Sequence, residues 1–306
     1  MKKITYKGWK NCVLLANKQV ELVVITEVGP RIIRFGFKGG DNEFMEFKPQ
    51  LGKKGGQKWL IYGGHRLWHA PESMPRTYFP DNVPVKVEER KGLVRFIQTV
   101  ETTTGIQKEM DISLSSSQAR VKVAHRLRNT GPWAVELAPW ALSVMAPGGK
   151  VIIPLPPRGP HSDPKNLPPT STLTLWSYTD LSDARWVWGS KYFMLQQNPS
   201  QPWPQKIGAM VPDGWAAYAN RGRLFLKRFA FQPGKAYPDH GCSVETFTNG
   251  QMLEVESCGP LTSLRPGASV EHVEEWSLYR NVPEPHNDAD VERLVLPLVR
   301  ASQKKS

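Results

Sequence analysis

Cysteine is scarce in this chain of 306 residues, which carries only Cys12, Cys242 and Cys258. Three cysteines without metal-ligand spacing argue against a disulfide framework and against a cysteine-based zinc site. No uninterrupted apolar stretch is long enough to span a membrane, and the first ten residues lack the apolar region of a signal peptide. These absences predict a cytoplasmic protein with no membrane partner.

Three motifs of large enzyme classes are also missing: the serine-nucleophile elbow, the phosphate-binding loop and the dinucleotide glycine fingerprint. The spacing of His65, His69 and Glu72 would suit metal ligands on a helix. However, the double glycine before them and Pro71 after them disfavour a helix. The sequence therefore predicts no cofactor and no metal site.

The chain is basic, with 40 Lys and Arg against 28 Asp and Glu and a formal net charge of +12. A basic surface attracts nucleic acid or acidic small molecules. Here the charge is spread along the chain, and no nucleic-acid-binding motif accompanies it. We therefore expect a solvated basic surface and no nucleic-acid partner, while an acidic ligand stays an open alternative.

What the chain does have is proline, tryptophan and short β-branched segments. Twenty-seven prolines disfavour a helical protein, because each removes a backbone donor. Successive short segments with turn residues between them are typical of two packed antiparallel sheets. The sequence predicts an all-β sandwich that forms a single domain over residues 1–306. The segments expected as strands include 20–29, 31–37, 83–90, 93–101, 106–114, 120–129, 192–197, 206–211, 215–220, 224–231, 242–248, 252–257 and 269–279.

Two segments depart from this pattern. Residues 147–169 contain eight prolines and little periodicity, which predicts a long loop over one face of the domain. Residues 290–296 are the one good helix candidate, with Asp288 or Asp290 as a cap. Pro297 is expected to end or kink that helix.

The segment 62–72 is the most unusual in the chain, because two His, an Arg, a Trp and a Glu follow one another beside Gly63-Gly64. Loops rich in polar and aromatic groups commonly carry sites. We expect a site at His65, Arg66, Trp68 and His69, and the polar stretch continues to Asp81. The alternative is a structured loop whose polar groups bond internally.

A second candidate is Glu245, in the segment expected as a strand from Cys242. Alternation along a strand places it beside Phe247, on the face opposite Val244. A carboxylate that loses hydration beside an aromatic ring has a raised pKa, which suits proton transfer. On spacing alone, an ordinary solvent-facing Glu is the stronger interpretation, and more so for Glu254 and Glu256.

Tryptophans provide candidate sugar platforms, because the C–H faces of a sugar stack on an indole ring. Trp140 is the first candidate, and Lys227 stands mid-strand among aromatic residues, where it suits either a site or the core. Most of the tryptophans are expected in the core. The further candidates are Trp176, Trp186, Trp188, Trp203 and Trp215.

Three parts of the chain, in this order, resemble the galactose mutarotase-like superfamily of aldose 1-epimerases and their relatives. The stretch 63–68 (GGHRLW) looks like the early segment that supplies a sugar-binding arginine. The stretch 126–131 (RLRNTG), continuing to Trp140, is similar to the N-x-G turn and the strand after it. The stretches 241–246 (GCSVET) and 264–269 (LRPGAS) resemble the glutamate-bearing strand and the later L-x-P-G turn.

The resemblance implies a β-supersandwich with a concave sugar site. It makes Glu245 the general base and gives Arg66 a ring hydroxyl to bind. Active relatives have a histidine after the N-x-G turn that protonates the ring oxygen, whereas this chain has APWAL at 138–142. His65 is the substitute acid in our hypothesis. With it, the resemblance implies ring-opening mutarotation of a sugar, an isomerase activity; the alternative is a carbohydrate-binding protein without catalysis.

Overall fold

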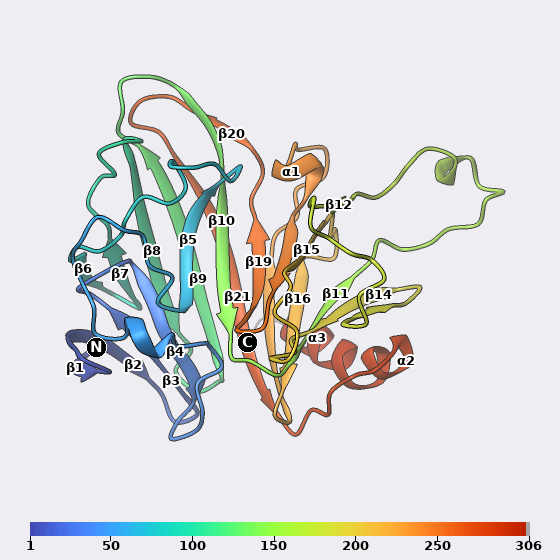
Figure 1. Ribbon diagram of the computed structural model, residues 1–306, viewed down its shortest axis with the longest axis horizontal. Helices are drawn as coiled ribbons and strands as arrows, with labels where there is room; N and C mark the ends of the chain where they lie inside the picture. Colours follow the sequence, from blue (N-terminus) through green and yellow to red (C-terminus); the bar gives the residue numbers. More distant parts are fainter. Residues whose placement is uncertain (304–306) are drawn as a thin grey trace.

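A computed structural model describes residues 1–303 and consists mainly of two large antiparallel sheets (Figure 1). The first sheet runs in the order β1-β2-β3-β4-β5-β10-β19-β18-β15-β12, with β20 paired to β10. The second runs β13-β14-β11-β16-β17-β21-β9-β8-β7-β6. The predicted all-β sandwich is confirmed.

The strands of the first sheet are β1 (Lys2–Tyr6), β2 (Trp9–Ala16), β3 (Val20–Ile25), β4 (Arg31–Phe37), β5 (Gly64–Ala70), β10 (Val135–Met145), β12 (Leu173–Leu175), β15 (Gln205–Ala209), β18 (Val244–Thr248), β19 (Leu253–Cys258) and β20 (Thr262–Leu264). Those of the second are β6 (Lys86–Arg90), β7 (Leu93–Ile97), β8 (Ile106–Leu114), β9 (Arg120–Asn129), β11 (Lys150–Pro154), β13 (Trp186–Trp188), β14 (Tyr192–Gln196), β16 (Trp215–Asn220), β17 (Arg223–Phe229) and β21 (Ser269–Arg280). The short helical turns are η1 (Lys48–Gln50), η2 (Pro164–Asn166) and α1 (Pro238–Gly241).

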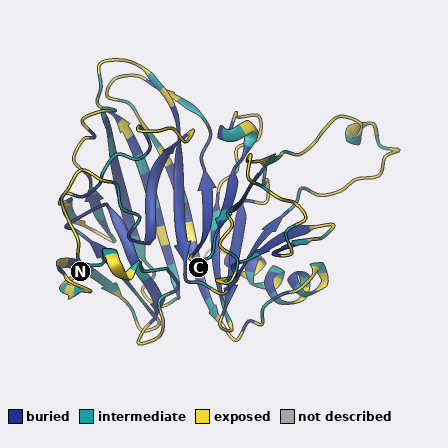
Figure 2. Cartoon of the chain, in the orientation of Figure 1, coloured by how far each residue is buried: buried dark blue, intermediate teal, exposed yellow. Residues whose placement is uncertain are grey.

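The main hydrophobic core lies between the two sheets. Strand β9 illustrates why: Val121, Val123, His125 and Leu127 are buried, while the residues between them are intermediate or exposed. This two-residue period places one face of the strand against the opposite sheet. Both sheets contribute to one continuous apolar cluster, and burial follows the centres of the strands while the loops stay exposed (Figure 2).

A second apolar cluster covers the outer face of the second sheet near the C-terminus. Helical residues run through α2 (Asp288–Asp290), a π-helical segment η3 (Val291–Val295) and α3 (Leu296–Gln303). Their Val291, Val295 and Val299 pack over β11, β14, β16 and β17. In residues 1–303, no helix has the length and apolar character that crossing a membrane requires.

The helix extends beyond the predicted range 290–296, because Pro297 does not end it. The π-helical turn immediately precedes the proline, and Leu296 donates to Val291 across five residues. Such a turn changes the hydrogen-bond spacing at the place where proline has no N–H to offer.

The predicted loop over 147–169 is wrong in its first part, because β11 lies inside it. This strand is fully buried and pairs with both β14 and β16. Its sequence, KVIIP, contains the short apolar run Val-Ile-Ile, which is typical of a strand that is buried on both faces. The irregular chain begins only after Pro154, where a long loop leaves the body of the protein (Figure 1).

The segment 62–72 contains the central strand β5, Gly64–Ala70, where a loop was expected. All seven residues of β5 are buried, and β5 pairs with β10 along its whole length. Gly63, just before the strand, has a φ of 101°, and Gly64, its first residue, has a φ of 71°. A Cβ on Gly64 would lie 2.3 Å from the carbonyl oxygen of Ile32, so the close pairing of β4 with β5 requires glycine there.

We predict that Gly64→Ala destabilises the protein far more than Gly92→Ala. Both glycines have positive φ, which costs an alanine about 1–2 kcal/mol, but Gly92 has no atom within 4 Å of the added Cβ. Overpacking at Gly64 adds about 1–3 kcal/mol more. Urea unfolding of the two variants measures the difference. Equal destabilisation would show that the backbone at Gly64 relaxes freely.

Candidate functional site

Strand register gathers a row of side chains on one face of the first sheet. Arg66 on β5 pairs with Leu142 on β10, which pairs with Glu256 on β19, which pairs with Glu245 on β18. Directly opposed residues of antiparallel strands project from the same face. Arg66 and Glu245 therefore share a face, three strand spacings or about 14 Å apart at the backbone.

The rows on either side belong to the same face. One contains Trp68, Trp140 and Cys258. The other contains Glu254, Phe247 and Lys206. This face points away from the opposite sheet, since the intervening residues of the same strands, such as Leu67 and Val255, belong to the core between the sheets.

A pocket of about 230 Å³ opens on this face, and we call it the cleft. Its volume lies below the roughly 300–1,000 Å³ of sites for drug-sized ligands, so it suits a smaller molecule. The wall is unusually aromatic. The lining residues are Trp59, Ile61, Arg66, Trp68, Glu72, Tyr78, Trp140, Leu142, Tyr178, Lys206, Phe247, Met252 and Glu254.

Lys206 is the best-fixed charged group in the cleft. Its Nζ lies 2.8 Å from Glu245 Oε2 and 3.9 Å from both Glu256 and Glu72. The same ammonium lies over the rings of Trp140 and Trp176, at 4.7 and 4.4 Å from their centroids. Carboxylates and two indole faces together hold this side chain in one position.

The buried carboxyls beside Lys206 release their protons at a higher pH than exposed glutamates do. Burial raises the pKa of Glu245 and that of Glu256, and Lys206 only partly offsets this. Burial opposes the charge of Lys206 as well, but the surrounding carboxylates outweigh it and raise the lysine pKa. One ammonium cannot neutralise two adjacent carboxylates, so the pair retains a proton that can be exchanged.

Arg66 forms the other charged pair of the cleft. Its Nη2 lies 2.9 Å from Glu254 Oε1, and its guanidinium lies 4.4 Å from the Trp68 ring centroid and 5.5 Å from that of Trp59. Its Nε and Nη1 have no hydrogen-bond partner, and neither has Trp59 Nε1. Buried donors without partners are costly, and a polar ligand would satisfy them.

The structure thus brings four of the predicted site residues to the cleft or its floor: Glu245, Arg66, Trp68 and Trp140. Glu245 itself is fully buried, so Lys206 lies between it and the open pocket as the contact that a ligand meets. Trp140 also donates from Nε1 to Glu256 Oε2 at 2.7 Å, which links the aromatic wall to the buried carboxyls.

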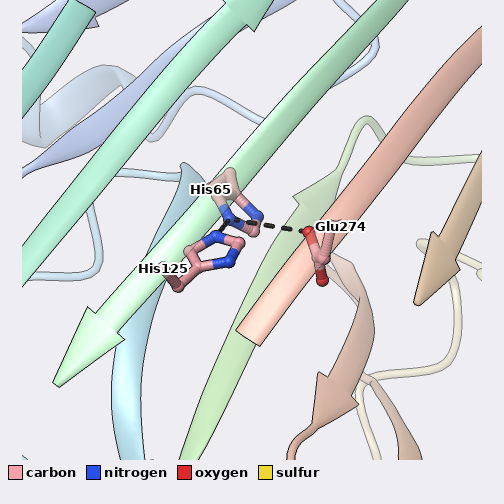
Figure 3. Close-up of side chains that lie close together, drawn as sticks. All are labelled: His65, His125 and Glu274. Carbon is pink, nitrogen blue, oxygen red and sulfur yellow. Dashed lines mark hydrogen bonds and ion pairs between the residues drawn. The ribbon is translucent and has the colours of Figure 1, made fainter. Parts of the chain in front are cut away.

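His65 projects from the opposite face of β5, into the space between the sheets (Figure 3). Its Nε2 lies 2.7 Å from His125 Nε2, and its Nδ1 lies 2.9 Å from Ser143 Oγ. His125 Nδ1 donates to the His272 carbonyl, so His125 Nε2 accepts and His65 Nε2 carries the hydrogen. Neutral imidazoles therefore satisfy every ring nitrogen of this pair.

The same space holds Lys227, whose Nζ lies 2.9 Å from Glu274 Oε1. Glu274 Oε1 also accepts from Ser257, and Oε2 accepts from Trp276 Nε1. His65, His125 and Glu274 have the donor types of a metal site. However, hydrogen bonds already account for the nitrogens and the carboxylate, and the lysine supplies the positive charge. We interpret the cluster as a structural network.

His69 and Asp81 also lie outside the cleft. His69 projects between the sheets, where its Nε2 lies 3.3 Å from Glu101 Oε2. Asp81 pairs with Arg31 at 3.0 Å, in a separate cluster beside Tyr62. Of the residues predicted for the site, His65, His69, Asp81 and Lys227 are thus separated from the cleft by the sheet or by distance along it.

Sequence reasoning did not select Lys206 and ranked Glu254 and Glu256 as surface residues. The available signal was the alternation in 252–258, where Met252, Glu254, Glu256 and Cys258 share a face. From the sequence, the charged face of this segment is expected to face solvent, whereas Glu254 and Glu256 are almost fully buried at the cleft.

We predict that the difference in free energy of unfolding between the wild type and the His272→Gln variant becomes smaller as the pH falls. Burial lowers the pKa of His272 to about 3, against about 6.5 when unfolded. Below pH 6.5 the unfolded wild type therefore binds a proton that the folded wild type does not, and the wild type loses stability. Glutamine does not titrate, so the variant lacks this pH-dependent loss of stability. The difference in free energy of unfolding should therefore decrease by about 2 kcal/mol between pH 7.5 and pH 5.

Urea unfolding at the two pH values tests this, with His161→Gln as the control because His161 lies exposed in the long loop. A difference for His272→Gln that stays constant with pH would contradict neutral burial of this imidazole.

Solved structures resemble this fold at low sequence identity. A galactose mutarotase-like protein from Lactobacillus casei aligns with a TM-score of 0.57 and 9% identity, over 88% of this chain and 100% of that one. A candidate aldose 1-epimerase from Klebsiella pneumoniae aligns with a TM-score of 0.59 and 11% identity, over 99% and 87%. A galactose mutarotase related enzyme from Lactobacillus acidophilus gives 0.54 and 9%, over 89% and 99%.

No protein-family model and no curated protein sequence matches the chain. The likeness is therefore one of fold, and it extends over 88% and 99% of this chain in two of those structures. The chain has the galactose mutarotase-like fold, as its sequence resemblance predicts.

Proposed function

We propose that the cleft binds a monosaccharide and that Glu245 and Lys206 exchange protons with it in a mutarotation-type reaction. The observation that carries the proposal is the unsatisfied polar lining: Arg66 Nε and Nη1 have no hydrogen-bond partner in a wall rich in aromatic rings. Sugars present hydroxyls to such donors and C–H faces to aromatic rings. The names of the structural neighbours point in the same direction.

An uncharged sugar fits this cleft better than an acidic one. Arg66 already pairs with Glu254, and Lys206 faces Glu72, Glu245 and Glu256. Every cation that lines the cleft is thus matched by at least one carboxylate. A sugar acid or phosphate would find no unpaired positive charge, despite the basic charge of the whole chain.

Mutarotation needs a group that accepts the anomeric proton and one that donates to the ring oxygen. In our proposal the ammonium of Lys206 donates a proton to the ring oxygen. The amine so formed accepts the anomeric proton and shares it with the buried Glu245 behind it, which restores the starting charge of the pair. His65 has no part in this, because it lies on the other face of β5. The pair takes the place of the carboxylate and imidazole that our sequence hypothesis expected.

We expect the wild type to accelerate the interconversion of aldose anomers, measured by polarimetry. Glu245→Gln and Lys206→Met should each lower the enzymatic rate by about 10²–10⁴, because each removes one member of the proton-exchanging pair. Glu275→Gln is the matched control, since Glu275 is an exposed carboxylate on β21. Loss of activity in the control, or full activity in Glu245→Gln, would contradict the assignment.

Carbohydrate binding without catalysis is the second candidate. Two observations favour it: Glu245 is fully buried, and within residues 1–303 no imidazole lines the cleft. Titration of a monosaccharide panel against tryptophan fluorescence distinguishes the two. Binding that Arg66→Met weakens about tenfold or more, with anomers interconverting at the spontaneous rate, would establish the binding protein and exclude the enzyme.

A further inference from the structure

A second cavity, of about 350 Å³, lies at the end of β5 on the side away from the cleft. Its walls come from the loop after β5, the turn before β8 and the start of β10. The larger part of its surface is apolar and includes Pro75, Ile106, Val135 and Leu137. The polar part consists of His69, Arg76, Thr103, Thr104 and Glu136.

His69 is the unusual member of this wall. It is 1% exposed, and its Nδ1 has no hydrogen-bond partner. Its other nitrogen, Nε2, lies 3.3 Å from Glu101 Oε2. An unpartnered nitrogen in a buried ring is costly, and it is not explained by the packing of the core.

Glu101 fixes which nitrogen of His69 carries the hydrogen. Lys108 Nζ lies 2.5 Å from Glu101 Oε1, and Thr104 Oγ1 donates to Oε2 at 2.6 Å. Burial alone would raise the pKa of Glu101, but Lys108 and His69 outweigh it and lower the pKa to about 2. An ionised carboxylate accepts, so His69 Nε2 donates, and Nδ1 is left with a lone pair.

His69 stays neutral in this setting, because burial lowers its pKa and the bond to Glu101 offsets only part of the effect. A ligand that satisfies Nδ1 must therefore donate a hydrogen. Arg76 stands nearby with its Nε unpartnered, and a guanidinium N–H needs an acceptor. A hydroxyl group has both functions.

We propose that the second cavity is a binding site for a small apolar molecule carrying one hydroxyl, such as a phenol or short alcohol, with His69 as the acceptor of its O–H. The apolar body packs on Ile106, Val135 and Leu137, and Arg76 donates to the hydroxyl oxygen. This site is independent of the sugar proposal. Its wall and that of the cleft have no residue in common, although β5, β10 and the loop over 71–80 contribute different residues to both.

The probe is p-cresol, compared with its methyl ether and with p-toluate, in calorimetric titrations of the full chain. We expect saturable binding of p-cresol and at least about tenfold weaker binding of the ether, which has no hydrogen to donate. Nitrogen NMR of the His69 ring should show the Nδ1 signal shifting on addition of p-cresol. Equal affinity for the ether, tighter binding of p-toluate, or no saturable binding would overturn the proposal.

Two variants locate the binding. His69→Phe keeps a ring but removes the acceptor, and should reduce the tenfold preference for the phenol over the ether to about one. Val135→Trp fills the cavity from a half-buried position and should abolish binding even if His69→Phe does not fold. Arg66→Met, in the cleft, is the control: if it abolishes p-cresol binding, the ligand sits in the cleft and the proposal is wrong.

Discussion

The ammonium group of Lys227 fixes the two sheets to each other at the level of the cleft. The residue belongs to β17 in the second sheet, yet its Nζ donates to the carbonyls of Ala141 and Val255 in the first. Glu274 neutralises it at 2.9 Å. Breaking such a buried pair by removing one partner is costly, so strands β10 and β19 are held from behind where their front faces carry the cleft.

Because β10 and β19 are held rigidly from behind, the cleft can keep two buried carboxyl groups close together. Glu245 and Glu256 lie close together and buried, and both have raised pKa values. The folded protein therefore loses stability as the pH rises above the ordinary carboxyl pKa of 4.5, because the unfolded chain releases these protons first. Lys206 and the indoles of Trp140 and Trp176 limit that cost by holding one cation over both carboxyls. A looser sheet would relax the carboxyls apart and lose the poised proton.

The fold was readable from the sequence, but half of the site was not. Strand β9 at 120–129 was predicted to the residue because its apolar and polar positions alternate. β5 was expected as a loop, since His65 and His69 on its inner face are as polar as Arg66 on its outer face, and the alternation is hidden. Lys206 could not be predicted as a site residue, because only the pairing of β15 with β18 brings it close to Glu245. The register between strands that are distant in the chain cannot be predicted from the local sequence.

Strand β5 supplies the two cavities from alternate residues, with Arg66 and Trp68 facing the cleft and His69 the second cavity. From the same strand, His65 hydrogen-bonds to His125 in the buried network between the sheets. A substitution in this strand changes one of these roles at a time. Insertion or deletion of one residue within it would exchange all of these roles together, putting guanidinium in the core and imidazole in the cleft. Divergence of this protein should therefore proceed with the length of β5 held constant.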